Sequence, residues 1–332
     1  GWGYITVEKA SRRSGRLQVS VNGSQGSFGI YEVRDDGKEV PLLSSYDFFS
    51  STAFMLRIGR KEYLLNYAGG IRSEARRTEA GLQIAYTVPG KAFFLLDFAF
   101  PAERAESAVQ VTLYTVNRGE NPQTFTSKAI FDTILGESSS RHFSTYESPE
   151  LNTQRKFQTM KNDRWIRSAN KTASIAFLLH GADVSEPGSV TLGPIAGLSE
   201  SWEPTVNEGK GFSTVLSYNN SGIAVNWKTA YLLPGQEDAK RFFIASANEA
   251  ELLDRLEAGT VAFPVKAAAG QDQQAASAAA QIPAAETQDL QQLSPAAQAV
   301  TEAQLDFEYI QNLIDYIESL EGEDSINREE YT

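Results

Sequence analysis

Short runs of β-branched and aromatic residues recur between residues 2 and 263, and Gly, Asn, Pro and Asp separate them. In the first clear pair of runs, apolar and polar positions alternate over residues 17–21 and 27–33, with Asn22 and Gly23 between them. Alternation is typical of a half-buried strand, and an Asn-Gly pair adopts the positive φ angles of a tight turn. The pattern therefore predicts a β-hairpin.

The same reasoning predicts further antiparallel pairs, formed by residues 54–58 with 62–66, 82–88 with 93–100, and 109–116 with 124–135. Later strands are expected at 173–179, 189–192, 212–218, 223–228 and 241–247. No helical period longer than about two turns precedes residue 245, which disfavours βαβ units and a parallel sheet. The first predicted helix spans residues 247–257, with Asn248 as its cap and Gly259 beyond its end.

The chain changes character twice after this helix. Residues 266–304 contain 14 Ala and 9 Gln in 39 residues and no aromatic residue, a composition typical of a flexible linker. An apolar stripe with helical spacing then follows, made of Leu305, Tyr309, Leu313, Tyr316 and Leu320. We therefore predict a mainly β protein: an antiparallel β-sandwich domain over 1–265, a linker over 266–304, and an acidic amphipathic helical tail over 305–332 that is cut short.

The net charge of −12 belongs mostly to that tail. Residues 301–332 hold ten acidic residues and one basic residue, which leaves 32 acidic and 29 basic residues in 1–300. A nearly neutral body without a basic cluster lacks the positive surface that binds nucleic acids and anionic membranes. The longest apolar runs, 92–100 and 175–179, are far shorter than the roughly 20 residues of a membrane-spanning helix.

The absence of cysteine excludes disulfides, thiolate zinc sites and cysteine nucleophiles. It also fits a protein of the bacterial envelope. The chain begins with Gly1 rather than Met, as expected after removal of a signal peptide or of an expression tag. We therefore expect an extracytoplasmic protein, periplasmic or in the cell envelope.

Only two histidines are available for acid–base chemistry, His142 and His180. Asp132, Glu137 and His142 follow one another at five-residue spacing around Gly136, so one loop would present carboxylates and an imidazole to a sugar hydroxyl or a hard cation. In the alternative, Asp132 and its neighbour bond the backbone at a strand edge while Glu137 pairs with Arg141 in solvent. His180 closes a predicted strand, where a structural role is expected.

The tryptophans offer candidate sugar-stacking surfaces. Trp227 lies in an alternating run and is expected in the core, whereas Trp165 and Trp202 lie near turns. We predict Trp165, Trp202 and Arg141 as ligand-binding residues. The motifs of serine hydrolases, phosphate loops, zinc proteases and dinucleotide-binding folds are all missing, so no cofactor and no metal are predicted.

Several segments resemble bacterial envelope proteins that carry galactose-mutarotase-like β-supersandwich domains. They are residues 109–118, 131–136, 173–181, 192–202 and 218–226. Over residues 1–265 the chain is similar to uncharacterised spirochaete envelope proteins that carry such a domain before a helical tail. Mutarotases of this fold use a histidine acid and a carboxylate base, and neither histidine here aligns with those roles. The resemblance thus implies the architecture and carbohydrate binding, without implying catalysis.

Two functional hypotheses follow. The leading one is a non-catalytic extracytoplasmic binding or scaffold protein, whose β domain recognises a carbohydrate or a protein and whose tail stripe binds an envelope partner. The alternative is a carbohydrate-active enzyme of the mutarotase, epimerase or lyase type that uses His142 with Glu137 or Asp132. Convergence of His142, a carboxylate and a tryptophan on one face would favour the enzyme.

Overall fold

The computed structural model describes most of the predicted β domain, namely residues 3–44, 52–66, 69–103, 105–138, 141–212, 220–246 and 250–264. The predicted linker over 266–304 and tail over 305–332 lie outside these residues. The division into domains and the partner-binding stripe therefore stay predictions.

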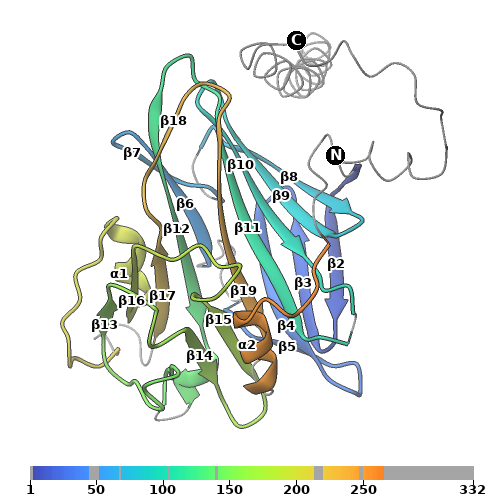
Figure 1. The fold of residues 1–332 in the computed structure, drawn as a ribbon, viewed down its shortest axis with the longest axis vertical. Helices are drawn as coiled ribbons and strands as arrows, with labels where there is room; N and C mark the ends of the chain where they lie inside the picture. Colours follow the sequence, from blue (N-terminus) through green and yellow to red (C-terminus); the bar gives the residue numbers. More distant parts are fainter. Residues whose placement is uncertain are drawn as a thin grey trace, which may run out of the picture. The chain divides into compact units, whose positions relative to one another are not determined.

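The described residues of the domain form three antiparallel sheets (Figure 1). The first contains, in spatial order, β1 (Tyr4–Val7), β8 (Arg72–Thr78), β9 (Gly81–Val88), β10 (Ala92–Ala99), β11 (Ala108–Asn117), β19 (Glu237–Ala245), β15 (Ser174–Leu178) and β14 (Trp165–Ala169). The second contains β13 (Arg155–Phe157), β16 (Ser189–Pro194), β17 (Ser221–Asn226), β12 (Gln123–Thr133), β6 (Ala53–Ile58) and β7 (Lys61–Leu64), with β18 (Ala230–Leu232) beside β12. The third contains β2 (Lys9–Ser14), β3 (Leu17–Asn22), β4 (Ser27–Val33) and β5 (Glu39–Pro41).

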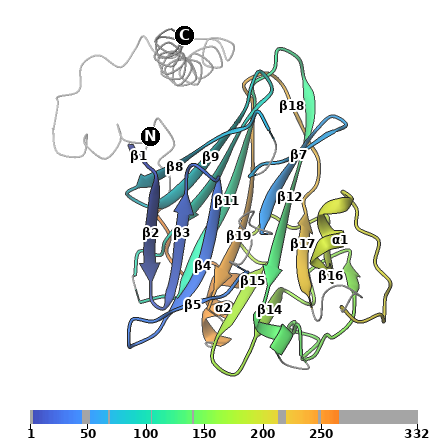
Figure 2. The same cartoon turned by 180° about the vertical axis from the view of Figure 1, so that it is seen from behind.

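The sheets form two layers around a common core. The first sheet is one layer, and the second and third sheets pack against its core-facing side; the third sheet lies in front of it in Figure 2, and the second sheet lies beside it in both views. Aromatic rings join the layers: Phe28 of β4 lies 5.2 Å from Phe98 of β10, and Phe131 of β12 lies 5.8 Å from Phe242 of β19. Facing sheets with interdigitating side chains define a β-sandwich, which confirms the predicted fold class.

The hairpins β3–β4, β6–β7 and β9–β10 form as predicted. The turn predicted for the first is wrong in detail, because Asn22 belongs to β3 and the positive φ angle, 57°, is at Gly26 rather than at Asn22 and Gly23. The pairing expected between residues 109–116 and 124–135 is wrong, because β11 pairs with β10 and β19 while β12 pairs with β6 and β17. Asn117 directs the chain into the other layer: its Nδ2 donates to the carbonyls of Asn121 and Leu232 at 3.0 and 2.9 Å, and its Oδ1 accepts from Gly119. This network gives a buried side chain all its partners at the crossing point.

In the described part of the domain there are three short helical segments: the 3₁₀ helix η1 (Leu135–Ser138), α1 (Ile195–Glu200) and α2 (Ala250–Glu257). The helix α2 packs Leu252, Leu253 and Leu256 against Phe243 on the outside of the first sheet. Gly259 follows it with a φ of 71°, as predicted for a residue beyond a helix end, and the expected cap Asn248 lies outside the described residues. Within the described segments, no helix is both long enough and apolar enough to span a bilayer.

Candidate acid–base site

The structure brings the three predicted acid–base residues together around Ser221, the first residue of β17. Asp132, near the end of β12, pairs with Gly222 in the sheet. Glu137, in η1, accepts a hydrogen bond on Oε1 from the backbone N–H of Ser221 at 3.0 Å. The Nδ1 atom of His142 lies 2.8 Å from the Ser221 hydroxyl. The side chains of Glu137 and His142 thus both contact Ser221, which lies 79 positions after His142 in the sequence.

A tight turn at Gly136 permits this arrangement. A Cβ atom at Gly136 would overlap the carbonyl group of His142, so a side chain has no room here. The N–H of Gly136 donates to the Ser168 hydroxyl at 3.2 Å, and the N–H of His142 donates to Asn152 at 3.0 Å. These bonds hold the loop against its neighbours and direct the imidazole toward Ser221.

The His142 ring lies in a mostly apolar setting. Only 7% of the residue is exposed, and the ring of Phe212 lies 4.8 Å away. Burial lowers the pKa of His142 because the charged imidazolium loses water, which favours the neutral ring. The direction of the hydrogen bond between the Ser221 hydroxyl and Nδ1 depends on the tautomer of the ring. If Nδ1 accepts from the hydroxyl, Nε2 carries the ring proton and donates; if Nδ1 donates, Nε2 accepts.

Glu137 is half-buried beside this ring. The pKa of Glu137 is raised to about 7, mainly by burial; the hydrogen bond from Ser221 opposes this rise, and the negative charge of Asp132 adds to it. A carboxyl group with this pKa takes up and releases a proton at neutral pH. Glu137 therefore has the property that general acid–base catalysis requires.

The raised pKa has a consequence for stability. In the unfolded chain Glu137 releases its proton near pH 4.5, whereas in the folded protein it keeps the proton up to about pH 7. The folded state binds more protons in this window, so its contribution to stability is full below pH 4.5 and is lost as the pH rises to 7. We expect the free energy of unfolding of the wild type, measured by urea titration relative to Glu137→Gln, to fall across this window. A constant difference between the two proteins would contradict the raised pKa.

The sequence-based alternative for this loop is only partly met. Thr133 does bond the backbone, because its hydroxyl donates to the carbonyl of Ser221 at 3.0 Å. The N–H of Asp132 donates to the Thr52 hydroxyl, and the carbonyl of Asp132 accepts from the N–H of Ser44. Glu137, however, is not in solvent. Arg141 is exposed. The pKa of Arg167 is lowered mainly by burial, and the positive charge of Arg141 lowers it further.

The other predicted residues lie elsewhere. Trp202 is corrected from a surface position to the interior: it is 5% exposed, and the Arg57 guanidinium lies 4.6 Å from its ring, so no face is free for a sugar. Trp165 is half-buried against the apolar cluster under α2. Trp227 is buried as predicted and donates from Nε1 to the carbonyl of Ser185. His180 directly follows Leu179. The backbone N–H of Leu179 donates to the carbonyl of Arg164, the residue just before β14.

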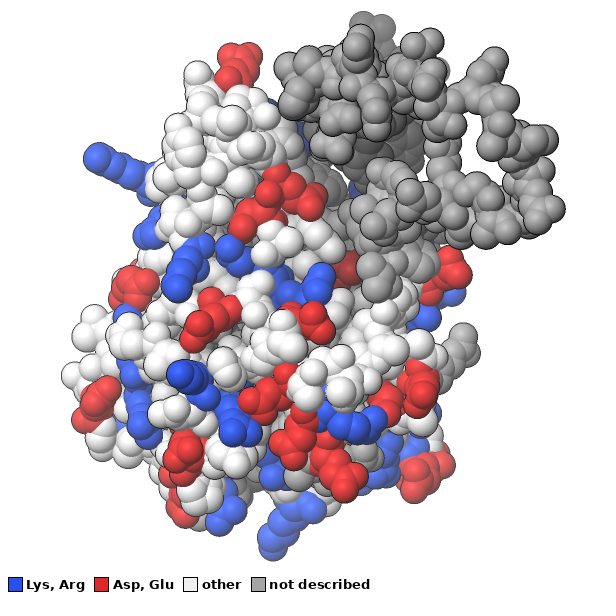
Figure 3. Space-filling view, in the orientation of Figure 1, with Lys and Arg blue, Asp and Glu red and all other residues white. Residues whose placement is uncertain are grey.

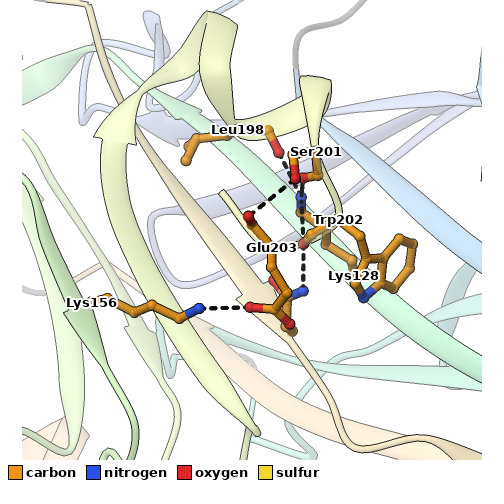
Figure 4. Close-up of polar contacts among 7 residues, drawn as sticks. Lys128, Lys156, Leu198, Ser201, Trp202 and Glu203 are labelled. Carbon is orange, nitrogen blue, oxygen red and sulfur yellow. Dashed lines mark hydrogen bonds and ion pairs between the residues drawn. The ribbon is translucent and has the colours of Figure 1, made fainter. Parts of the chain in front are cut away.

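Sequence reasoning did not single out Lys128, whose side chain is fully buried on the outer side of β12 (Figure 4). Its Nζ donates to the carbonyls of Leu198, Ser201 and Trp202 at 2.6, 2.8 and 3.2 Å. These carbonyls lie at the C-terminal end of α1, where backbone acceptors lack partners and negative dipole charge accumulates. Burial lowers the Lys128 pKa to about 8. The lysine therefore stays charged at pH 7 and uses all three protons. The only sequence signal was a lysine inside an apolar strand.

Charge elsewhere on the domain is mixed. Figure 3 shows Lys and Arg interspersed with Asp and Glu on the face of Figure 1, with no large region of one sign. Within the described ranges, no group of three or more His, Asp or Glu side chains is placed to hold a metal ion.

Comparisons with known proteins give a likeness of fold. No protein-family model and no curated protein matches the chain. A galactose mutarotase related enzyme from Lactobacillus acidophilus aligns at a TM-score of 0.43 and 9% identity, covering 72% of this chain and 97% of that one. A GalM/aldose epimerase homologue from C. elegans aligns at a TM-score of 0.43 and 11% identity, covering 75% of this chain and 100% of that one. A galactose mutarotase-like protein from Lactobacillus casei aligns at a TM-score of 0.42 and 9% identity, covering 73% of this chain and 99% of that one. At these scores the likeness carries no argument about activity.

Proposed function

We propose that this protein is a carbohydrate-active enzyme that uses Glu137 and His142 for general acid–base chemistry on a reducing sugar. The observation that supports this most is the convergence of both side chains on Ser221, at a place where burial, helped by the charge of Asp132, raises the pKa of Glu137 to about 7. A carboxyl group whose pKa is about 7 is suited to exchange protons with a substrate at physiological pH, and the burial that lowers the pKa of His142 favours its uncharged ring.

The chemistry that suits this pair is opening and closing of a sugar ring. A base takes the proton of the anomeric hydroxyl, an acid protonates the ring oxygen, and the C1–O5 bond breaks; closure on the other face returns both protons. Ionised Glu137 would act as the base. Neutral His142 would donate from Nε2 when Nδ1 accepts the proton of Ser221. The sugar as substrate class comes from the sequence resemblance to mutarotase-like domains.

The test is anomer exchange by the full chain with a panel of reducing aldoses, followed by NMR at concentrations of enzyme that exceed background mutarotation. We expect Glu137→Gln and His142→Asn to lower the rate about 10²–10⁴-fold while the thermal unfolding midpoint changes little. The matched control is His180→Asn, which should retain full activity. A rate unchanged in Glu137→Gln, or lost equally in the control, would remove the proposal.

A second candidate, a non-catalytic binding or scaffold protein, is supported by a different observation. The His142 residue is 7% exposed, and Trp202 and Trp165 pack in other apolar clusters rather than beside it. For this candidate no aldose is turned over, and affinity capture from envelope extract gives a partner with the full chain and not with a chain ending at Val265. That result would assign the partner contact to residues beyond 265.

A further inference from the structure

A groove of about 580 Å³ runs over the outer face of the third sheet, the face turned toward the viewer in Figure 2. Alternation along the strands produces this face: Val19 and Val21 of β3 enter the core, while Ser20 and Asn22 point outward into the groove. Its volume is within the range of roughly 300–1,000 Å³ that is usual for small-ligand sites. Asp132, Glu137 and His142 do not line it.

Hydroxyl and amide groups cover the floor of the groove. Ser11 and Ser20 are cross-strand neighbours, and their hydroxyls lie 2.7 Å apart. Asn22 donates from Nδ2 to the Gln25 side chain at 3.1 Å, and both residues line the groove. Each of these groups both donates and accepts hydrogen bonds, which is the property that a sugar hydroxyl requires of its partners.

An aromatic ring lies on the same floor. Tyr31 of β4 is half-buried, and its ring lies against Gly29 so closely that a Cβ atom there would be 2.7 Å from the Tyr31 Cε2 atom. Glycine therefore leaves the space in which the ring rests on the strand. A tyrosine ring held against a sheet supplies a rigid apolar surface for the C–H face of a sugar, with a hydroxyl at its edge.

The charged side chains that the structure describes along the groove are both cationic. Lys9 of β2 and Arg77 of β8 are exposed, and no carboxylate is found among the described lining residues. The whole chain, in contrast, carries a net charge of −12. We propose that this groove binds an acidic oligosaccharide, with Tyr31 stacking on a sugar ring, the Ser and Asn side chains bonding hydroxyls, and Lys9 and Arg77 pairing with uronate carboxylates.

The probe is trigalacturonate, compared with neutral galactotriose, in calorimetric titrations of the full chain at low salt. We expect tighter binding of the acidic sugar, and weaker binding as salt is added, because the ion pairs are exposed. Lys9→Gln and Arg77→Gln should each weaken trigalacturonate binding about fivefold to tenfold without a change for the neutral sugar. Matched controls are Lys171→Gln and Arg72→Gln, two exposed cations that do not line the groove.

Tyr31→Ala and Gly29→Ala test the stacking surface in two ways, since the first deletes the ring and the second displaces it. Both should weaken binding by about tenfold while thermal unfolding stays close to wild type. Ser44 lines one end of the groove and bonds the Asp132 carbonyl, so Glu137→Gln is measured as well and should bind normally. The proposal does not rest on the acid–base site. Equal affinity for both sugars, no measurable binding of either, or loss of binding in Glu137→Gln alone would overturn it.

Discussion

Replacing Lys128 with methionine is expected to lower the free energy of unfolding by about 2–4 kcal/mol, although the two side chains are similar in length. The Lys128 ammonium supplies one proton to each of three carbonyls at the end of α1, and the residue is fully buried. Methionine fills the space without donating, so the carbonyls of Leu198 and Ser201 lose the Lys128 donor at a cost of about 1–3 kcal/mol each, whereas the Trp202 carbonyl keeps a bond from Asn226 Nδ2. Removing a buried charge recovers part of this, because the charge itself was costly to bury.

The matched control is Lys156→Met on β13, at the edge of the same sheet. Lys156 pairs with Glu203 at 2.6 Å, but the Glu203 side chain is 58% exposed, and surface ion pairs of this kind contribute about 0–1 kcal/mol. Urea unfolding of both variants at pH 7 measures the difference. Equal losses in the two variants would show that the carbonyls of Leu198 and Ser201 find other donors when Lys128 is absent.

Replacing Gly136 with alanine should destabilise the domain by about 1–3 kcal/mol and displace His142 from Ser221. The new Cβ would overlap backbone atoms of His142, which cannot move aside as a flexible side chain would. Forcing one extra carbon into a packed site costs about 1–3 kcal/mol in shifted backbone and side chains. We therefore expect the histidine ring signals in NMR to lose their wild-type shifts and any sugar turnover to fall with them.

The control for this substitution is Gly197→Ala, in α1, where a Cβ would meet nothing within 4 Å. Alanine is favoured over glycine in a helix by about 1 kcal/mol, so this variant should be as stable as the wild type or more stable. If Gly136→Ala behaved in the same way and the His142 shifts were retained, the turn described for this loop would be wrong.

Local pattern was enough to predict most of the strands and the loop that carries the acid–base residues. Alternation located β3 and β4 because each buries one face, and side chains along a strand point to opposite faces, whereas β10 was located by its apolar and aromatic run and is buried on both faces. Asp132, Glu137 and His142 were predicted to lie together because ten residues around a glycine turn cannot separate far. The same pattern missed β8, whose one apolar core residue is Ala75 and whose Arg76 stacks on Tyr4 at 4.0 Å.

Tertiary structure decided what local pattern could not contain. Which sheet a strand joins depends on partners far along the chain, so the separation of β11 from β12 was not visible in their similar hydrophobicity. Ser221 reaches Glu137 and His142 only because β17 pairs with β12. The burial of Trp202 and the role of Lys128 depend on where α1 ends, since the groups they contact are backbone carbonyls and aliphatic side chains that carry no sequence signature. The acid–base loop was local and could be read from the sequence, whereas the burial that raises the pKa of Glu137 to about 7 depends on the packing of distant segments and required the fold.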